Sequence, residues 1–566
     1  MSHSRKFWGT ATAMLVALCC AVVSSGCAVF RYVDYKVPSI RVERPHNAPL
    51  PTREDPAVQQ ALDKWAGMTD DAARAFPTPY HVYVDTPAPG TFEGEYVVGL
   101  AFSGGGTRGT VFEAMCVNAI RELGHIVVET PDGARRIAVL DEVDYVSGAS
   151  TGAIPAAAFA LNRTETCPET VRFAHWPDCF NANLTGRVMR HELMRPDRIL
   201  RDVVLGPNVG PAVTGAMAAA FFDGNAHCPA SGLTFGDLPQ TPVLLVGATV
   251  VNDPAVPFIH TRLPYRYCID TYPHTTWGIG VQTFESFHAD PMTYALGQAA
   301  YNSSSFPGYM RSGLMAVRAD QAWVFEGLEG AARERLERAR HQPGYGGVYE
   351  LKDGGLVDNR AIAPIDRIFD AVASRGGWES RPLLIALDAG YLDIRQPEKG
   401  ANLLGKGWSS EVYAVMRASW QTGQYAYERL FDKNVADGVY AHARFRLTAW
   451  TRYLTGTVPS EQSEPGLSPF SRPSEGHSEP GPSPFPPSPE ADYLRKLCRQ
   501  APAIGTPSRL LEALRGIGTT LTDLSERQMD ALRVAAEFAV WHEKDALIAW
   551  ASAIYDGAPA RFAPSG

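Results

Sequence analysis

The sequence predicts an α/β protein in which a mostly parallel central sheet is flanked by helices. Short apolar segments, bounded by glycine or proline, alternate with stretches that carry apolar residues at helical spacing. Nearly continuous apolar segments of this kind are typical of strands that a parallel sheet buries on both faces. The expected strands are 96–102, 126–128, 145–146, 243–248 and 382–387, and the first is followed by an expected helix over 110–123.

The N-terminal residues 1–26 are predicted to be a lipoprotein signal peptide. Arg5 and Lys6 precede an apolar segment of about 13 residues, shorter than the roughly 20 that span a membrane. The Gly26-Cys27 pair resembles a bacterial lipobox, with Ser24 where Leu is usual. We therefore expect lipidation at Cys27 and a protein anchored in the bacterial cell envelope, at the outer membrane facing the periplasm. An ordinary cleaved signal and an uncleaved membrane anchor are the alternatives.

Composition divides the remaining chain into four parts. Residues 27–92 are rich in Pro, Asp and Ala, which predicts a tether and lead-in, and 93–456 form the main domain. Residues 457–490 are dominated by Ser, Pro, Glu and Gly, a composition that predicts a disordered insertion. Amphipathic spacing resumes in 491–566, predicted to be a helical part that packs on the main domain. The segment 161–238 is read either as a lid over a binding site or as ordinary core helices.

The charge of the chain excludes one class of partner. Lys and Arg total 52 against 61 Asp and Glu, which gives a net charge of -9, and the chain has no Lys/Arg-rich segment. We therefore expect no nucleic acid partner, and membrane contact has to come from an anchor or apolar surface. The cysteines show no CxxC or Cys/His ligand spacing, so we expect no structural zinc. The sequence leaves the oligomeric state open.

A glycine-rich loop follows the first expected strand and precedes the first expected helix. Its residues Gly104, Gly105 and Gly106 leave backbone amides available to an anion, next to the positive end of a helix. The anion is either a dinucleotide diphosphate or the oxyanion of an ester under attack. Gly109 completes a dinucleotide fingerprint, and Glu129 ends the next strand about 20 residues later. The envelope location and a second motif argue against the dinucleotide.

That second motif runs from Gly148 to Gly152, again between a strand and a helix. A nucleophile elbow needs small residues on both sides, because its serine lies in a strained turn with the hydroxyl facing a cleft. Ser150 meets this requirement and is the candidate nucleophile. The amide of Thr151 would point toward the same oxygen as the amides of the glycine loop, completing an oxyanion hole.

A serine nucleophile needs a base within hydrogen-bond reach. The order Ser, Asp, His of an α/β-hydrolase would use His442, His477 or His542. His477 lies in the predicted insertion, and the other two follow no evident strand end. The segment from Asp353 to Gly355 offers a carboxylate at a turn, although an isolated Asp-Gly-Gly is also a plain β-turn. These residues alone do not decide between the bases.

The three segments Gly104–Gly109, Gly148–Gly152 and Asp353–Gly355, in this order, resemble the signatures of the patatin-like phospholipase family, here in a bacterial lipoprotein-type member. Segment 299–307 and the Asp358-Asn359 pair support this resemblance.

The resemblance implies a three-layer patatin-like fold and a Ser150–Asp353 dyad without histidine, metal or cofactor. The chain would be a lipid acyl hydrolase of phospholipase A or lysophospholipase type, acting on membrane phospholipid or another lipid ester through an acyl-enzyme. Gly104, Gly105 and Gly106 match the oxyanion glycines of the family. Arg108 matches its basic position, which steadies the loop, attracts a lipid phosphate, or forms a structural ion pair. Gly109, Gly148, Gly152, Gly354 and Gly355 would support these motifs.

Because a free Asp has a pKa of about 3.9, Asp353 should lie in a poorly hydrated cleft to act as a base. A Ser-His-Asp esterase and a non-catalytic, lipid-binding envelope lipoprotein are the competing readings.

Overall fold

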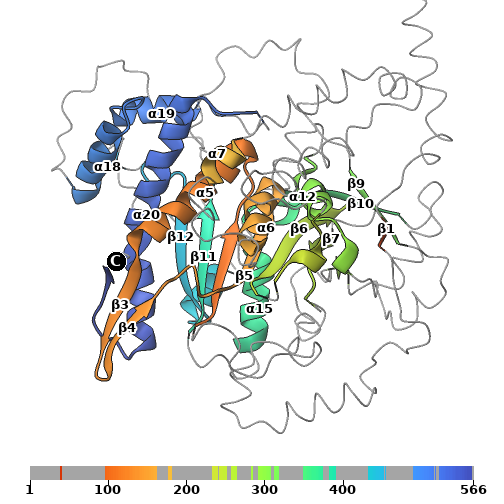
Figure 1. Cartoon of the computed structure of the whole chain (residues 1–566), viewed down its shortest axis with the longest axis horizontal. Coiled ribbons are helices and arrows are strands. Elements are labelled where there is room, and N and C mark those ends of the chain that lie inside the picture. Colours follow the sequence, from red (N-terminus) through yellow and green to blue (C-terminus); the bar gives the residue numbers. More distant parts are fainter. Residues whose placement is uncertain are drawn as a thin grey trace, which may run out of the picture.

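Figure 1 shows the fold of the chain as a computed structural model. The structure describes residues 39–40, 96–161, 176–181, 233–239, 241–251, 256–263, 282–284, 291–306, 312–317, 348–373, 381–390, 431–451, 453, 488–515, 517 and 522–563. The predicted signal peptide with Cys27, the insertion up to residue 487 and most of segment 161–238 lie outside these residues. No helix within the described ranges is long and apolar enough to cross a membrane.

The centre of the fold is a mixed sheet of ten strands, and its parallel part confirms the predicted fold class. Five strands follow one another in the spatial order β6, β5, β2, β11, β12, each parallel to its neighbour. Their bounds are β2 Val98–Phe102, β5 Val143–Ala149, β6 Val243–Val250, β11 Leu383–Asp388 and β12 Ala441–Arg446. Four of the five expected strands, β2, β5, β6 and β11, therefore belong to this sheet.

Antiparallel pairing extends the sheet beyond β6. Strand β6 pairs with β7 (Val256–His260) and with β10 (Val348–Asp353), and β10 pairs with β9 (Gly313–Val317). Strand β8 (Gln282–Thr283) pairs with β7. Within the predicted tether, β1 (Ser39–Ile40) pairs in parallel with β9, so part of this segment is an edge strand.

Helices cover both faces of the sheet, as the three-layer prediction requires (Figure 1). One face buries its side chains against α5 (Gly106–Leu123), α6 (Ala153–Leu161) and α12 (Leu296–Ser304). The opposite face packs against α15 (Ala363–Ala373). The two faces follow the alternation of side chains along a strand, since Leu100 lies in the first core and Ala101 in the second. Helix α5 begins at Gly106, within the glycine-rich loop.

Segment 126–128 forms a strand in a different sheet from the one expected. Strand β3 (His125–Thr130) pairs antiparallel with β4 (Gly133–Ile137) and with β13 (Ala560–Ala563), apart from the central sheet. This small sheet lies beside α20 in Figure 1. An apolar pattern indicates that a strand is buried, but it does not say which elements bury it.

The C-terminal part is helical. Helices α18 (Pro489–Gln500) and α19 (Pro507–Arg515) lead to the long helix α20 (Glu526–Ile554), whose core side chains join those of α5 and β12. Ser525 starts α20 with a capping box, in which its hydroxyl accepts from the Gln528 amide and the Gln528 side chain accepts from the Ser525 amide. The indole of Trp550 donates to the Arg381 carbonyl at 2.9 Å, which joins α20 to the segment before β11.

Candidate active site

Ser150 lies in a strained turn at the end of β5. Its φ is +53°, a left-handed conformation that non-glycine residues rarely adopt, and the turn leads through Ser150–Gly152 into α6. The two flanking glycines leave no room for a side chain. A Cβ on Gly148 would lie 2.6 Å from the Ala153 Cα, and one on Gly152 would lie 2.3 Å from the Ser103 carbonyl oxygen. The small residues on both sides therefore have a direct steric cause.

Strand β6 brings Ser150 and Asp353 together. Ala149, which precedes Ser150, pairs with Gly247, and Asp353 pairs with the next residue, Ala248. Because β7 pairs with β6 over both positions, β5 and β10 must share the other edge of β6. The two strands run in opposite directions along this edge, and they end facing each other.

The hydroxyl of Ser150 donates a hydrogen bond of 2.8 Å to Asp353 Oδ2. The other carboxylate oxygen, Oδ1, accepts from the Gly355 amide at 2.7 Å. Asp353 is only 3% exposed. Burial raises the pKa of Asp353 to about 6, against the lowering effect of the bonds from Ser150 and Gly355. The carboxylate thus lies in the poorly hydrated environment expected for it.

The end of α12 fixes the backbone around Asp353. The Ser305 carbonyl accepts from the Asp353 amide at 3.3 Å, and the Ser303 carbonyl accepts from the Gly354 amide at 2.9 Å. The hydroxyl of Thr249 donates to the Asp353 carbonyl at 2.9 Å. Gly354 packs so closely that a Cβ there would lie 2.2 Å from the Gly247 carbonyl oxygen. The motif glycine is therefore required by the contact with β6.

The glycine loop lies directly against Ser150, but one of its three amides is already occupied. The Gly104 amide donates to the Asn359 carbonyl at 2.7 Å, so it is not a free oxyanion donor in this structure. Its Cα faces the candidate nucleophile, since a Cβ on Gly104 would lie 2.6 Å from the Ser150 Cβ. Of the three glycine amides expected to bind the oxyanion, only those of Gly105 and Gly106 therefore remain as candidates.

The remaining amides have the arrangement of an anion site. No described residue accepts a hydrogen bond from the amides of Gly105 or Gly106, at the start of α5. The hydroxyl of Thr151 donates to the Gly106 carbonyl at 3.1 Å, which holds the elbow against the loop. A dinucleotide fold would place the strand after this helix beside β2, whereas β3 belongs to the small sheet and β2 pairs with β5 and β11.

Arg108 is buried and faces the protein interior. It is 4% exposed and its guanidinium donates to the Ala389 carbonyl at 3.3 Å, beyond the end of β11. Gly109 contributes its amide to the Gly105 carbonyl at 3.3 Å. Of the readings for Arg108, this geometry favours the one in which it steadies the loop.

The two late histidines that the structure describes contact other aromatic side chains, His442 the ring of Phe431 and His542 the ring of Phe538. His542, on α20, contacts the Tyr453 hydroxyl at 3.1 Å. His442 lies near the beginning of β12, where burial and the neighbouring arginines lower its pKa to about 3. Neither hydrogen-bonds to Ser150, whose hydroxyl partner among the described residues is Asp353.

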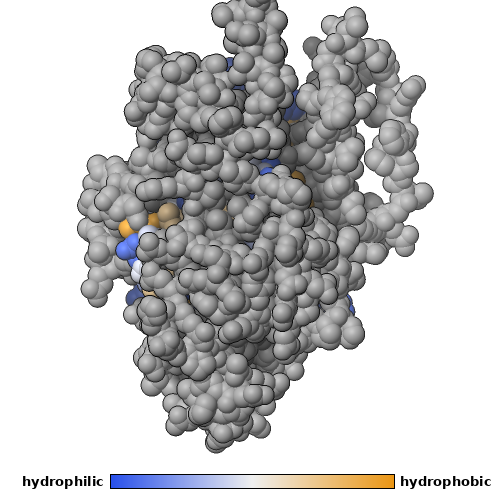
Figure 2. Space-filling view, turned by 90° about the vertical axis from the view of Figure 1, so that its right-hand side faces the viewer, coloured by the Kyte–Doolittle hydropathy of each residue, from blue (hydrophilic) through white to orange (hydrophobic). Residues whose placement is uncertain are grey.

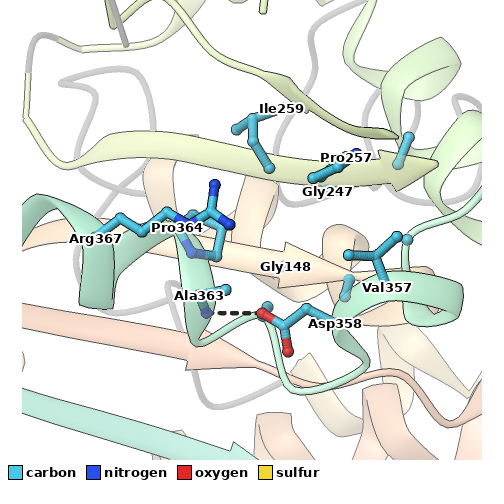
Figure 3. Close-up of a pocket in the computed structure, with 13 residues that line it drawn as sticks. Gly148, Gly247, Pro257, Ile259, Val357, Asp358, Ala363, Pro364 and Arg367 are labelled. Carbon is cyan, nitrogen blue, oxygen red and sulfur yellow. Dashed lines mark hydrogen bonds between the residues drawn. The ribbon is translucent and has the colours of Figure 1, made fainter. Parts of the chain in front are cut away.

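Figure 3 shows a small pocket lined by residues of β5, β6, β7 and α15. Its cavity volume is about 30 Å³, and it lies between β5, β6, β7 and the start of α15. There Asp358 accepts from the Ala363 amide at 2.7 Å. Its lining includes Ala149 and Gly354, the chain neighbours of Ser150 and Asp353. Ile259, which lines this pocket, belongs to the core on the α15 face of the sheet. Leu351 and Asp353 share one face of β10, and Leu351 belongs to the core on the opposite, α5 face. The pocket is therefore separated from the dyad by the sheet.

The sequence did not reveal the roles of several residues around the site, although Asn359, Ser303 and Ser305 lie in segments that support the family resemblance. Asn359 occupies the Gly104 amide, Ser303 and Ser305 hold the base, and Ser103 with Glu113 supports the glycine loop. Each acts on a partner far away in the chain or through a backbone carbonyl, which any residue type provides. Within the described parts of the chain, no group of three His, Cys, Asp or Glu side chains is placed to hold a metal ion.

Fold and geometry together define an α/β protein with a glycine loop, a serine elbow and a buried aspartate at the carboxyl ends of β2, β5 and β10. Residues 100–366, just under half of the chain, match the family model described as patatin-like phospholipase. This range contains all three predicted motifs.

Solved structures were also found to be similar, at low identity. Human GIVD cytosolic phospholipase A2 is 14% identical with a TM-score of 0.34, over 88% of this chain and 67% of that one. The same enzyme in complex with methyl gamma-linolenyl fluorophosphonate is 15% identical with a TM-score of 0.33, over 88% and 64%. VipD from Legionella pneumophila is 15% identical with a TM-score of 0.19, and the match covers 47% of this chain and 46% of VipD. No curated protein matches the sequence.

Proposed function

We propose that the chain is a lipid acyl hydrolase that uses Ser150 as nucleophile and Asp353 as its base. The observation that carries this proposal is the 2.8 Å hydrogen bond from a serine in a strained elbow to a desolvated carboxylate. A strained, buried pair is costly to maintain, and such strain persists mainly where a function requires it. The matched family model supports a lipid ester as substrate.

In the first half of the reaction, Ser150 Oγ attacks the ester carbonyl carbon while its proton passes to Asp353 Oδ2. A carboxylate whose pKa lies near 6 is a stronger base than a solvated one, and it is still ionised at neutral pH. When the tetrahedral intermediate collapses, the leaving alcohol takes the proton from Asp353. The acyl group is then bound to Ser150 as an ester.

The oxyanion of that intermediate would be bound by backbone amides. Gly105 and Gly106 offer donors at the start of α5, and Thr151 offers the amide that follows the nucleophile. These groups belong to rigid elements that contact each other through Thr151 and Gly106. They need little reorganisation when the charge develops.

In the second half, water hydrolyses the acyl-enzyme. Asp353, ionised again, takes a proton from the attacking water, and the same amides bind the second oxyanion. The proton then returns to Ser150 Oγ as the fatty acid leaves. One carboxylate therefore serves as base and acid in both halves, without a histidine.

The proposed substrates are membrane phospholipids, lysophospholipids or other lipid esters. The described residues expose two large hydrophobic side chains, Val251 and Met292. On the face shown in Figure 2 the described residues are visible only in small, separate areas. Lipidation at Cys27 would supply membrane contact independently of these side chains. Because lipidation at Cys27 would anchor the protein, we also propose that it lies in the cell envelope. Metabolic labelling with a fatty acid, compared between wild type and Cys27→Ala, tests the lipidation.

The proposed activity is tested with the full chain in detergent micelles. We expect wild-type protein to release fatty acid from a phospholipid and from a short-chain ester, and Ser150→Ala to release none above background. Gly247→Ala serves as a control near the site, because a Cβ there would make only an ordinary contact of 3.7 Å. Equal hydrolysis by wild type and Ser150→Ala would contradict the proposal.

A further inference from the structure

A carboxyl group lies in the core beneath the glycine loop and takes no part in the mechanism above. Glu113, on α5, is fully buried, and its Oε1 accepts a 2.9 Å hydrogen bond from the Ser103 hydroxyl. Its Oε2 has no partner among the described residues. Burial raises the pKa of Glu113 well above its usual range despite the lowering effect of hydrogen bonding from Ser103, and the charge of Asp388 adds a smaller rise. An apolar side chain would avoid this desolvation cost.

The Ser103 hydroxyl connects Glu113 to two other parts of the fold. It accepts a 2.8 Å hydrogen bond from the Ala389 amide, beyond the end of β11. The Ser103 amide donates to the Leu387 carbonyl at 3.2 Å. Ser103 thus joins α5, β2 and β11 at the residue directly before Gly104.

Without Glu113, the hydroxyl of Ser103 would have a weaker acceptor. Its other contact is the Gly104 carbonyl at 3.5 Å, which is within the loop itself. Gly104 lies against Ser150, with 2.6 Å between the Ser150 Cβ and a Cβ built on Gly104. A small rotation of Ser103 would therefore be transmitted to the donors beside the nucleophile.

We propose that Glu113 is a positioning residue for the oxyanion-binding loop, acting through Ser103. This inference rests on the proposed function of Ser150. Glu113 touches no reacting atom. It gives the Ser103 hydroxyl a fixed acceptor, so that the same hydroxyl can hold the Ala389 amide and keep the Gly105 and Gly106 amides aimed at one point.

The test uses the full chain with three substitutions. Glu113→Met keeps the length of the side chain and removes the acceptor, Glu113→Gln keeps an acceptor, and Ser103→Ala removes the donor. Cys116→Ala is the matched control, because Cys116 is equally buried one turn further along α5 and only packs. For each variant, kcat and KM are measured on a short-chain ester together with Tm. The affinity of a trifluoromethyl ketone, which forms an oxyanion on Ser150, is measured as well.

We expect Glu113→Met to lower kcat at least about tenfold, because misplaced oxyanion donors act on the transition state. Its KM should stay within about threefold, and ketone affinity should fall by the same factor as kcat. Its Tm should stay close to that of wild type, because relief of the desolvation cost of a buried acid offsets the weaker hydrogen bond left to Ser103. Glu113→Gln should retain kcat within about threefold. Cys116→Ala should lower Tm and leave kcat unchanged.

Full kcat in Glu113→Met would overturn the inference. The double variant gives a second test. If the losses of kcat in Glu113→Met and Ser103→Ala multiply in it, the two residues act independently, and the inference is overturned. If Glu113→Met does not fold, Ser103→Ala decides: a parallel loss of kcat and ketone affinity supports the role, and full activity removes it. Activity that survives in Ser150→Ala would instead refute the proposed function.

Discussion

The Ser150 hydroxyl and Asp353 Oδ2 lie 2.8 Å apart although 203 positions separate the two residues in the chain. The contact follows from the register of β6, whose neighbouring residues Gly247 and Ala248 pair with Ala149 and Asp353. A parallel and an antiparallel strand thus meet end to end on one edge of β6. The contact between Ser150 and Asp353 therefore depends on backbone pairing more than on loop conformation.

Replacing Asp353, the proposed base, should lower activity and raise stability above pH 6. We expect Asp353→Asn to lower kcat at least about a thousandfold, because Asn cannot take the proton of Ser150. The folded pKa of Asp353 is raised to about 6, so the native state binds this proton more tightly than the unfolded chain. Stability therefore falls as pH rises from about 4 to 6, by roughly 3 kcal/mol for a shift of about two units.

The Asn variant lacks this penalty, so its Tm should exceed that of wild type at pH 8 and approach it at pH 4.5. Asp366→Asn is the matched control. Asp366 is equally buried, with a pKa raised to about 6 mainly by burial, but it bonds to Asn434 on the α15 face. Its substitution should leave kcat within about threefold. Equal inactivation by both substitutions would show that Asp353 has no special role.

The pH dependence of the reaction should report the same carboxylate. We expect kcat/KM on a neutral ester to rise with pH through a single ionisation near 6 and then to stay level to pH 8, because Asp353 must be ionised to act. Added methanol should shift this midpoint upward, since it disfavours the charged form of a carboxyl group. A downward shift would instead indicate a histidine, and a flat profile to pH 4.5 would exclude Asp353 as the base.

The elbow should not tolerate a methyl group at either flank. Gly152→Ala would place its Cβ 2.3 Å from the Ser103 carbonyl oxygen, and Gly148→Ala would place one 2.6 Å from the Ala153 Cα. Both contacts are with backbone that cannot move aside cheaply. We expect each variant to lose at least about a hundredfold in kcat/KM and about 1–3 kcal/mol of stability. Gly247→Ala, in the neighbouring strand, should change kcat/KM by less than about threefold and stability by less than about 1 kcal/mol. Losses as large as those at Gly148 and Gly152 would contradict the steric explanation.

The ion pairs at the end of β11 should contribute more to the stability of the fold than the ion pairs at the surface. Burial would raise the pKa of Asp388, but Arg444 at 2.6 Å and Arg360 at 3.5 Å hold it below the usual range. We expect Asp388→Asn to destabilise the fold by about 3–5 kcal/mol at pH 7, because it leaves the buried Arg444 without its carboxylate.

A folded pKa below the unfolded value contributes stability above the unfolded pKa, near 4, and the contribution is lost as pH falls further. The Tm difference between wild type and Asp388→Asn should therefore shrink below about pH 4. Asp437→Asn is the control, since its ion pair with Lys433 is exposed; its Tm should match that of wild type. An equal effect of both substitutions on Tm would be inconsistent with this difference.

The sequence predicted the parts of the site that require particular residue types. Small flanks at Gly148 and Gly152, the serine between them and the glycines before α5 are imposed by close backbone contacts, and such contacts leave few alternatives. Asp353 could be chosen only through the family resemblance, because its pairing with β6 depends on long-range register. The occupied Gly104 amide was not predictable, since its acceptor is a main-chain carbonyl.

The position of β3 was not predictable for a related reason. Its apolar residues are buried as expected, but in a small sheet completed by β13, from the other end of the chain. Glu113 shows a further limit: a single acidic residue on a helix is usually solvent-exposed, and only the three-dimensional contact with Ser103 gives it a role.

The account is tested most directly by the reaction of Ser150 with a fluorophosphonate, followed by mass spectrometry of the intact chain and its peptides. We predict one adduct, on the peptide that contains Ser150, and at least a hundredfold slower labelling in Asp353→Asn. Labelling in His442→Ala and His542→Ala should proceed at the wild-type rate. An adduct on another residue, or equal labelling rates in wild type and Asp353→Asn, would contradict the Ser150–Asp353 dyad.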